Sequence, residues 1–367
     1  MKHMDEYRDP EVAQALSRKI RDRSTKPIRL MEICGTHTMA IFRHGIRSLL
    51  PQTVELVSGP GCPVCVTATE DIDRSLKLAA VPGLIITTFG DMFRVPGTSS
   101  SLQKERGNGA DVRMVYSTFD AITIARENPD RPVIFLGVGF ETTAPTVAAA
   151  VKAAHESALS NFFVLSAHKL LPPAMDALLS GGNLDIDGFL CPGHVTTVIG
   201  TSSYQSVVDR YGVPCVVTGF EPLDILQGIL MLVEQIEAAE ARVEIQYVRG
   251  VSPAGNIGAR SIMDEVFEPC DTPWRGLGVI PMSGLAIREK YAAHDASRRF
   301  DLNVPAAQEP PGCQCAAVLR GVVRPFECTL YRKVCTPRNP VGPCMVSSEG
   351  TCAAYFKYYD TSKTTKP

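Results

Sequence analysis

Short apolar runs of strand length recur along the first two thirds of the chain, and stretches with helical apolar spacing separate them. Residues 10–23 predict an amphipathic helix ahead of the first run. The predicted strands are 28–33, 54–57, 84–89, 112–116, 133–138, 162–165, 188–190 and 215–218. The predicted helices between them include 69–80, 145–158 and 223–241. Regular alternation of strand and helix is typical of parallel sheets with helices on both faces, so the sequence predicts an α/β protein.

A weak internal repeat divides these elements into two similar halves. ICGTH at 33–37 resembles VLSAH at 164–168, and PGCP at 60–63 resembles PGHV at 192–195, in the same order and at near-equal spacing. Such a repeat indicates two related α/β units, and a third region rich in Pro, Gly and Cys follows them. The predicted domains are 24–117, 118–248, and an irregular 249–367 that includes the N-terminal helix at 1–23.

Several reactive side chains fall where the predicted strands end. Ligands of parallel sheets bind beyond the carboxyl ends of the strands. If the two halves face each other, these groups line one cleft between the domains. The residues are Cys34, His37, Cys62, Cys65, His168 and His194.

Composition narrows the class of protein. Of the 367 residues 45% are hydrophobic and 21% are charged, which is typical of a soluble globular protein. The net charge of −2 provides no electrostatic footprint for nucleic acid. The apolar runs are too short to span a membrane, and the charged N-terminus does not resemble a signal peptide. We therefore expect a cytoplasmic protein that binds neither nucleic acid nor membrane.

Six of the twelve cysteines lie beyond residue 312. In a cytoplasmic chain such cysteines are expected to be thiols or metal ligands rather than structural disulfides. They contain no Cys-x-x-Cys pair, which argues against a zinc ribbon, whereas separate thiolates suit a [4Fe–4S] cluster. A group of small buried cysteines is the alternative, and spacing alone does not select four ligands. The six are Cys313, Cys315, Cys328, Cys335, Cys344 and Cys352.

The CPVC stretch, with Cys62 and Cys65, precedes a predicted helix start. The positive end of a helix dipole lowers a thiol pKa, which favours either disulfide exchange or metal binding. A structural zinc site completed by Cys34 and His37 is a further alternative. His37, three residues after Cys34, is suited to orienting the thiol or binding metal, although a hydrogen-bonded structural histidine explains it equally well.

GFETTAP at 139–145 places a carboxylate at a strand end, and we count Glu141 as a candidate catalytic residue. Helix capping explains the two threonines that follow it but explains Glu141 only in part. No phosphate-binding loop is present, and GVGFET lacks the third glycine of a dinucleotide fingerprint.

Together these motifs resemble one family. EICGTHTMAI, SGPGCPVC, GFETTAP and CTPRNPVGPCMVSSEGTCAAY resemble the HypD-type maturation factors of [NiFe] hydrogenases, over essentially the whole chain. The resemblance implies a scaffold that holds one iron while it gains two cyanides and one carbon monoxide. It also implies a small HypC-type partner, a HypE-type cyanide donor, and delivery to the hydrogenase large subunit. The implied fold is two similar α/β domains and a third domain that carries an iron–sulfur cluster.

The resemblance also assigns residues. It implies Cys34, Cys62 and Cys65 as iron-site cysteines, with His37 nearby. The family's cluster spacing matches four C-terminal cysteines and leaves Cys315 and Cys344 as non-ligands. The implied [4Fe–4S] ligands are Cys313, Cys328, Cys335 and Cys352.

Two other classes of protein are compatible with the same residues. A stand-alone iron–sulfur thiol-disulfide oxidoreductase would use CPVC as its dithiol and would not need Cys34. A zinc-stabilised structural protein would contain zinc and no sulfide. Whether the chain is an enzyme is left open, because an assembly scaffold with thiol or cluster redox activity could act either as a binding protein or as an enzyme.

Overall fold

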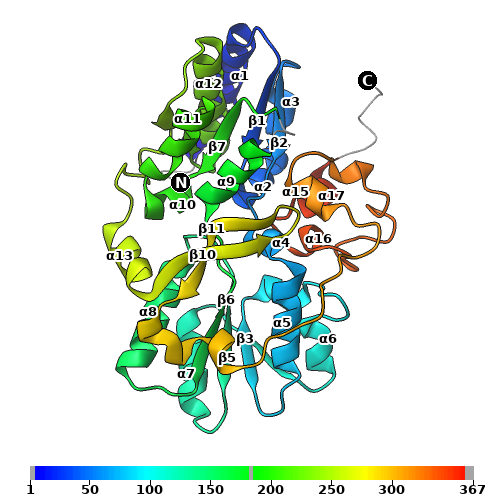
Figure 1. The fold of residues 1–367 in the computed structure, drawn as a ribbon. Coiled ribbons are helices and arrows are strands. Elements are labelled where there is room, and N and C mark those ends of the chain that lie inside the picture. Colours follow the sequence, from blue (N-terminus) through cyan, green and yellow to red (C-terminus); the bar gives the residue numbers. More distant parts are fainter. Residues whose placement is uncertain (1–4, 182–184, 360–367) are drawn as a thin grey trace.

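Two parallel sheets form the framework of the computed structural model, which describes residues 5–181 and 185–359 (Figure 1). The first sheet has the strand order β2-β1-β7-β8-β9, and the second has the order β4-β3-β5-β6. The α/β class and the eight predicted strands are confirmed. The strands are β1 Ile28–Glu32, β2 Val54–Ser58, β3 Ile85–Thr88, β4 Asp111–Met114, β5 Val133–Gly137, β6 Phe162–Ser166, β7 Gly188–Pro192, β8 Cys215–Thr218 and β9 Val243–Ile245.

The strand pairing divides the chain differently from the predicted boundaries. β1 pairs with β2 on one side and with β7 on the other, so the first sheet combines residues 28–58 with 188–245. The second sheet, from 85–166, is built from the chain between them. The predicted boundary between 117 and 118 falls inside the second sheet and does not separate the two. Backbone groups make the pairing, so alternation of strand and helix does not specify which strands become neighbours.

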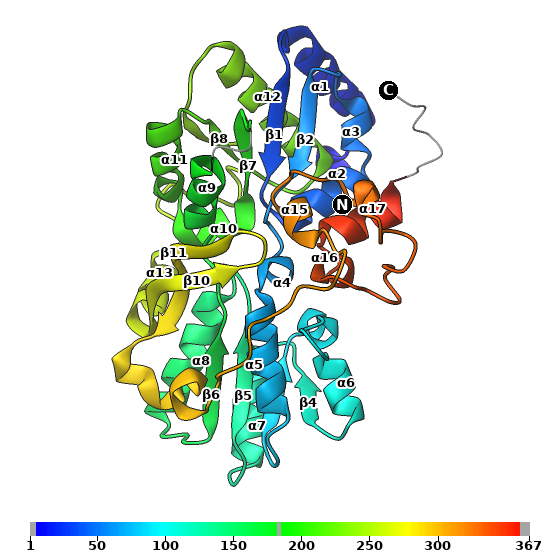
Figure 2. The same ribbon diagram turned by 45° about the vertical axis from the view of Figure 1, so that its right-hand side comes forward.

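Helices flank both sheets, as the two views of the ribbon show (Figures 1 and 2). Those of the first part of the chain are α1 Pro10–Arg23, α2 Gly35–Arg43, α3 Ile46–Leu49, α4 Pro63–Val66, α5 Thr69–Ala79, α6 Leu102–Gly107, α7 Thr118–Glu127, α8 Ala144–Glu156 and α9 Leu171–Ser180. The later helices are α10 Gly193–Ile199, α11 Gln205–Tyr211, α12 Pro222–Glu237, α13 Ile257–Val266, α14 Ala296–Arg299, α15 Cys315–Leu319, α16 Pro343–Val346 and α17 Thr351–Tyr358. Short 3₁₀ helices are η1 Asp5–Tyr7, η2 Gly90–Arg94, η3 Ser202–Tyr204, η4 Glu289–His294 and η5 Pro325–Glu327.

The N-terminal helix belongs with the first sheet and not, as predicted, with the C-terminal region. α1 packs against α12, and Ile20 shares a hydrophobic core with Ile225 and Leu226. Asp9 caps the helix through hydrogen bonds from two backbone N–H groups, and Pro10 occupies its first position. The apolar stripe of α1 is therefore buried against α12.

The predicted third domain, 249–367, does not fold as one unit. α13 packs against α8 beside the second sheet, and an extended segment at 301–312 leads from there to the cysteine-rich residues. In this last region α17 packs against α2, and α16 packs against α4. The C-terminal cysteines are thereby placed beside the turns that follow β1 and β2.

Sequence analysis missed an antiparallel hairpin formed by β10 Phe267–Trp274 and β11 Gly278–Ile287. The hairpin lies between the two sheets (Figure 2). It forms single β-bridges from Trp274 to Thr67 and from Gly284 to Lys169. The hairpin thus ties the segment that leaves the first sheet to the segment that follows β6.

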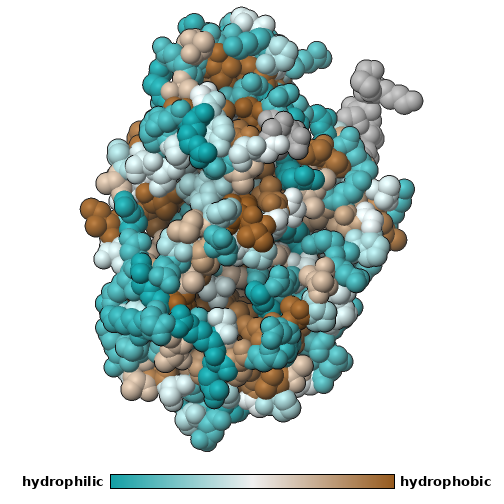
Figure 3. Space-filling model, viewed as in Figure 1, coloured by the Kyte–Doolittle hydropathy of each residue, from teal (hydrophilic) through white to brown (hydrophobic). Residues whose placement is uncertain are grey.

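None of the helices in residues 5–181 and 185–359 combines the length and apolar character that a bilayer crossing requires. On the face shown in Figure 3, hydrophobic residues form separate patches among hydrophilic ones.

Candidate functional site

Cys34 lies at the carboxyl end of β1, where it is the residue immediately before α2. β7 is a neighbour of β1 in the sheet, and α10 begins directly after β7 with Gly193 and His194. Because adjacent parallel strands end at the same edge, the two turns meet. The Cys34 Sγ lies 3.7 Å from His194 Nε2, and only 2% of the cysteine is exposed.

The Cys34 thiol is protonated at neutral pH. Burial raises its pKa to about 12, although backbone N–H groups of His37 and Thr36 at the start of α2 oppose that rise. Burial also lowers the pKa of His194, so its imidazole is neutral. A thiol beside a neutral imidazole is a suitable donor pair for a borderline or soft metal ion, which displaces the thiol proton when it binds.

His37 lies in the first turn of α2 and is 1% exposed. Its Nε2 donates to the Gly219 carbonyl at 3.0 Å, and its Nδ1 has no hydrogen-bond partner among the described residues. Burial lowers its pKa to about 4, so the ring is neutral with Nδ1 as a free acceptor. Phe220 stacks on His194 and is tilted against His37, so one aromatic ring holds both imidazoles.

The CPVC turn is pressed against the backbone of Cys34. A methyl group on Gly61 would lie 2.1 Å from the Cys34 backbone nitrogen, so only glycine permits this approach. The Gly35 N–H also donates to the Gly61 carbonyl at 2.9 Å. The structure therefore brings Cys34 and CPVC together, as the sequence predicts.

Cys62 and Cys65 are joined by a disulfide, which differs from the expectation that the cysteines are thiols. Cys62 precedes the short helix α4, and Pro63 is the first residue of that helix. The two-residue spacing on a single helical turn brings the sulfurs within bonding reach. A disulfide provides no thiolate, so metal binding by this pair requires its reduction first.

Glu141 and His168 lie apart from this group, beyond the ends of β5 and β6 in the second sheet. Glu141 accepts a hydrogen bond from the Leu171 N–H at 2.9 Å, and burial raises its pKa to about 7. His168 contacts Ser166 and Phe267, and burial lowers its pKa to about 3. The polar and ring contacts of His168 are thus with β6 and β10, and a cleft that it shares with Cys34 stays a prediction.

Sequence analysis missed one charged residue beneath Cys34. Glu32 is fully buried in β1, where it accepts from Thr38 Oγ1 at 2.6 Å and from the Cys34 N–H at 3.4 Å. Burial raises its pKa to about 7. A single acid within an otherwise apolar strand end was the available signal. His194 was placed at a strand end by the repeat but was not selected as a site residue.

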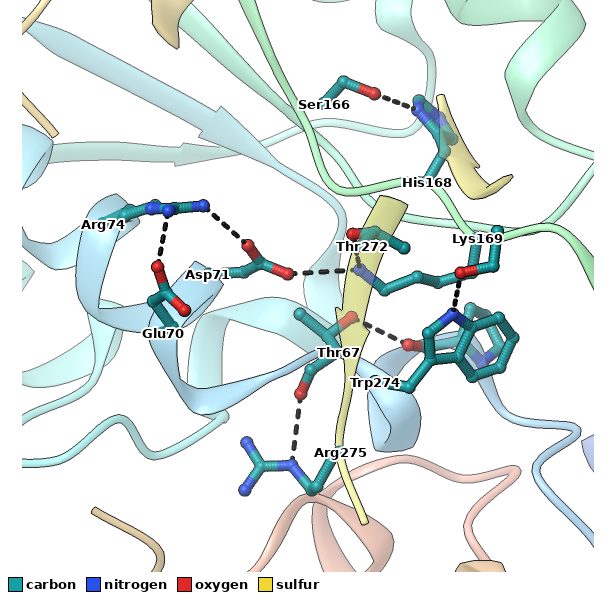
Figure 4. Close-up of polar contacts among 12 residues, drawn as sticks. Thr67, Glu70, Asp71, Arg74, Ser166, His168, Lys169, Thr272, Trp274 and Arg275 are labelled. Carbon is teal, nitrogen blue, oxygen red and sulfur yellow. Dashed lines mark hydrogen bonds and ion pairs between the residues drawn. The ribbon is translucent and has the colours of Figure 1, made fainter. Parts of the chain in front are cut away.

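A polar network anchors the segment that follows CPVC (Figure 4). Lys169 is fully buried and pairs with Asp71 at 3.2 Å and with Thr272 Oγ1 at 3.0 Å. Arg275, at the end of β10, donates from its backbone N–H to Val66 and from Nε to the Thr67 carbonyl. These contacts attach α4 and α5 to the hairpin and limit movement of CPVC.

All six C-terminal cysteines line one cavity, together with apolar side chains such as Val318, Leu330 and Met345. The donor set fits an iron–sulfur cluster. No three His, Cys, Asp or Glu side chains in the described ranges converge on one metal ion, but the thiolates around a cubane need not do so. The cavity that the six thiols line has a volume of about 20 Å³.

Two of the six cysteines connect this cavity to CPVC. Cys315 Sγ lies 2.6 Å from Cys344 Sγ. The residue before Cys344 is Pro343, whose carbonyl oxygen is 3.9 Å from Cys65 Sγ. Ser347, in the same segment, donates to Asp91 at 2.9 Å, and Arg94 donates to Pro337, so the loop after β3 holds the cysteine region in place.

Comparison with known proteins identifies the family. The family model described as HypD, Hydrogenase formation hypA family, matches residues 11–359. The chain belongs to the HypD family. The "Hydrogenase maturation factor HypD2" of Bradyrhizobium diazoefficiens is 48% identical over 98% of this chain and 97% of its own length. The proteins named "Hydrogenase maturation factor HypD" of Azotobacter vinelandii and Cupriavidus necator are 47% and 46% identical, each over 98% of this chain and 97% of its own.

Membership in the HypD family makes this chain one of the hydrogenase maturation factors, as the resemblance implied. The cysteine-rich region, the paired α/β framework and the grouping of Cys34 with CPVC are the features of the structure that bear on that role.

Proposed function

We propose that this HypD-family chain is the scaffold on which the Fe(CN)₂CO group of a [NiFe] hydrogenase is assembled. The observation that carries the proposal is the meeting of Cys34, His194 and CPVC at one edge of the first sheet. Iron with cyanide and carbonyl ligands favours soft thiolate donors, and three cysteines are available there. The proposed ligands are Cys34, Cys62 and Cys65, with His37 and His194 beside them.

Before iron can bind here, the Cys62–Cys65 disulfide must be reduced and the thiols that bind the iron must lose their protons. The Cys62–Cys65 disulfide takes up two electrons and two protons to become two thiols. Each thiol that binds iron then releases its proton, and for Cys34 this overcomes a pKa of about 12. The backbone N–H groups of Thr36 and His37 at the start of α2 are the protein groups that favour the resulting thiolate.

We infer that a cluster held by the C-terminal cysteines would pass the two electrons that reduce the Cys62–Cys65 disulfide, one at a time, from an external reductant. Cys313, Cys328, Cys335 and Cys352 would hold a [4Fe–4S] cluster, which transfers single electrons when bound. Cys315 and Cys344 lie 2.6 Å apart in the wall of that cavity, and Pro343, next to Cys344, contacts Cys65. This arrangement supports the assignment of Cys315 and Cys344 as non-ligands on the route between the two sites.

The proposed partners follow from the scaffold role. A small HypC-type protein is expected to dock beside Cys34, a HypE-type protein to donate cyanide, and the hydrogenase large subunit to receive the finished group, all in the cytoplasm. Glu141 stays a candidate for proton transfer, since one of its carboxylate oxygens has no partner among the described residues.

The test uses anaerobic protein co-expressed with its small partner. Infrared spectra are expected to show cyanide and carbonyl bands, and iron is expected to exceed the amount that one cluster needs. Cys34→Ala, Cys62→Ala and Cys65→Ala should each lose the bands and the maturation of hydrogenase. Cys270→Ala, a partly exposed cysteine on β10, is the matched control and should retain both.

The CPVC disulfide also favours a second candidate, a stand-alone iron–sulfur thiol-disulfide oxidoreductase. That activity would persist in Cys34→Ala and would act on unrelated disulfides without a partner. Normal hydrogenase maturation by Cys34→Ala would therefore reject the scaffold, whereas loss of the infrared bands with an intact cluster would reject the oxidoreductase.

A further inference from the structure

Arg275 is a buried cation that the scaffold role leaves unexplained. Its side chain is 0% exposed at the end of β10, where the guanidinium reaches the backbone between α4 and α5 (Figure 4). Nε donates to the Thr67 carbonyl at 3.1 Å, and Nη1 pairs with Glu309 in the extended segment at 301–312. Nη2 has no hydrogen-bond partner in the part of the chain that the structure describes. One N–H-bearing nitrogen of a buried charge is therefore unused.

The unused nitrogen belongs to a residue that adjoins the cysteine cavity. The backbone of Gly276, the next residue, packs against Ala316, and a methyl group on Gly276 would lie 2.7 Å from the Ala316 Cα. Ala316 follows Cys315, which lines the cavity. Glu309, the ion-pair partner of Arg275, precedes Cys313, another residue of the cavity wall, by four positions in the chain.

The charge of Arg275 is only partly compensated. A guanidinium cannot lose its proton in a protein, so the charge persists at every accessible pH. Glu309 is its ion-pair partner, but the Glu309 side chain is 48% exposed, and solvent weakens the field of an exposed carboxylate. The buried charge of Arg275 is therefore balanced by a carboxylate that is about half exposed.

We propose that Arg275 raises the reduction potential of the cluster held by the C-terminal cysteines, with Glu309 as the opposing charge. This inference rests on the proposed function, because it requires that a cluster is bound there. Reduction adds one electron to a site already surrounded by thiolates. A fixed, buried positive charge close to the cysteine cavity favours the form with the added electron. Arg275 is thus a positioning residue that acts through the electrostatic potential.

The experiment compares cluster reduction in four variants of the full-length protein purified anaerobically with its cluster. Dithionite supplies one electron per cluster, and electron paramagnetic resonance measures the reduced fraction at each solution potential. Arg275→Met should lower the equilibrium constant for reduction at least tenfold, which is about 59 mV for one electron. Glu309→Gln should shift the potential upward, and Arg275→Lys should lie nearest to the wild type. Arg338→Met removes an exposed charge from the same cysteine region and should change nothing.

The opposite directions of the potential shifts expected in Arg275→Met and Glu309→Gln distinguish an electrostatic effect from structural damage. A purely structural role predicts that Arg275→Met and Glu309→Gln both disturb the site in the same direction, since each breaks the same ion pair. Equal directions, or no shift in either variant, would overturn the inference while leaving the scaffold role standing. If Arg275→Met does not fold, the upward shift in Glu309→Gln still tests the sign. Wild-type protein without iron and sulfide would instead reject the cluster and the inference together.

Discussion

Gly61→Ala is expected to separate Cys34 from CPVC. The added methyl group would lie 2.1 Å from the Cys34 nitrogen and 2.3 Å from the Ile33 carbonyl carbon, and ordinary contacts begin at 3.4 Å. The turn must therefore retreat by about 1.3 Å, because backbone atoms cannot rotate away as a flexible side chain would. Gly61 does not have a positive φ, so contact rather than backbone strain is the cause.

The Gly61→Ala substitution is expected to lower both the stability of the protein and the yield of matured hydrogenase. Forcing a methyl group into a packed interior costs about 1–3 kcal/mol of unfolding free energy. A shift of about 1 Å between reacting groups reduces a rate by about 100-fold, so the yield of matured hydrogenase should fall far more than the stability does. The Gly35-to-Gly61 hydrogen bond, 2.9 Å in the wild type, should also be lost.

The assay measures site geometry and stability separately. Cobalt(II) added to the reduced protein gives an absorption that requires thiolate ligands, and its affinity should fall in Gly61→Ala. Urea unfolding can be followed through Trp274, the one tryptophan of the chain, which is buried beside Phe140. Gly107→Ala is the matched control, since its added methyl group meets nothing within 4 Å. The control should be neutral or more stable by about 0.4–1 kcal/mol.

Unchanged cobalt affinity and maturation in Gly61→Ala would refute the reasoning, because the contact with Cys34 would then not position the site. An equal loss in Gly107→Ala would show that the assay reports helix stability instead of the turn.

Two further predictions concern buried charges. Burial raises the pKa of Glu141 from 4.5 to about 7, so the folded state retains a proton that the unfolded state releases, and stability falls as pH rises between these values. Glu141→Gln should remove about 3 kcal/mol of that fall, whereas Glu32 should keep a similar contribution in the variant. Urea unfolding at pH 5 and at pH 8 measures the difference. A pH dependence of stability that is unchanged in Glu141→Gln would contradict this. Lys169→Met leaves Asp71 without its buried partner and should lose about 3–5 kcal/mol, whereas Lys77→Met at an exposed pair should lose about 0–1 kcal/mol. Equal losses in the two lysine variants would show that burial does not set the energy of the pair.

Much of the site could be predicted from local sequence. The apolar runs marked all eight predicted strands, because alternation of strand and helix is a property of neighbouring residues. The same reasoning placed Cys34 and CPVC at strand ends, where the structure also has them. The density of cysteines beyond residue 312 predicted a single site, and all six line one cavity.

Other features depend on contacts between residues far apart in the chain. Sequence analysis placed both His168 and His194 at strand ends, yet His194 is the one that contacts Cys34, because β7 pairs with β1 and β6 does not. The burial of Lys169 and Arg275 follows from the hairpin, whose strands gave no clear signal in a region rich in Pro and Gly.

The sequence by itself determined the class of fold, the positions of the strands and the chemistry available at their ends, because each depends on residue type and short-range spacing. Only the tertiary structure decided which strands are neighbours, which histidine contacts Cys34, and which cations are buried beside the hairpin. Strand pairing uses backbone groups that every residue shares, and burial is a property of the whole assembly, so neither can be determined from a local pattern.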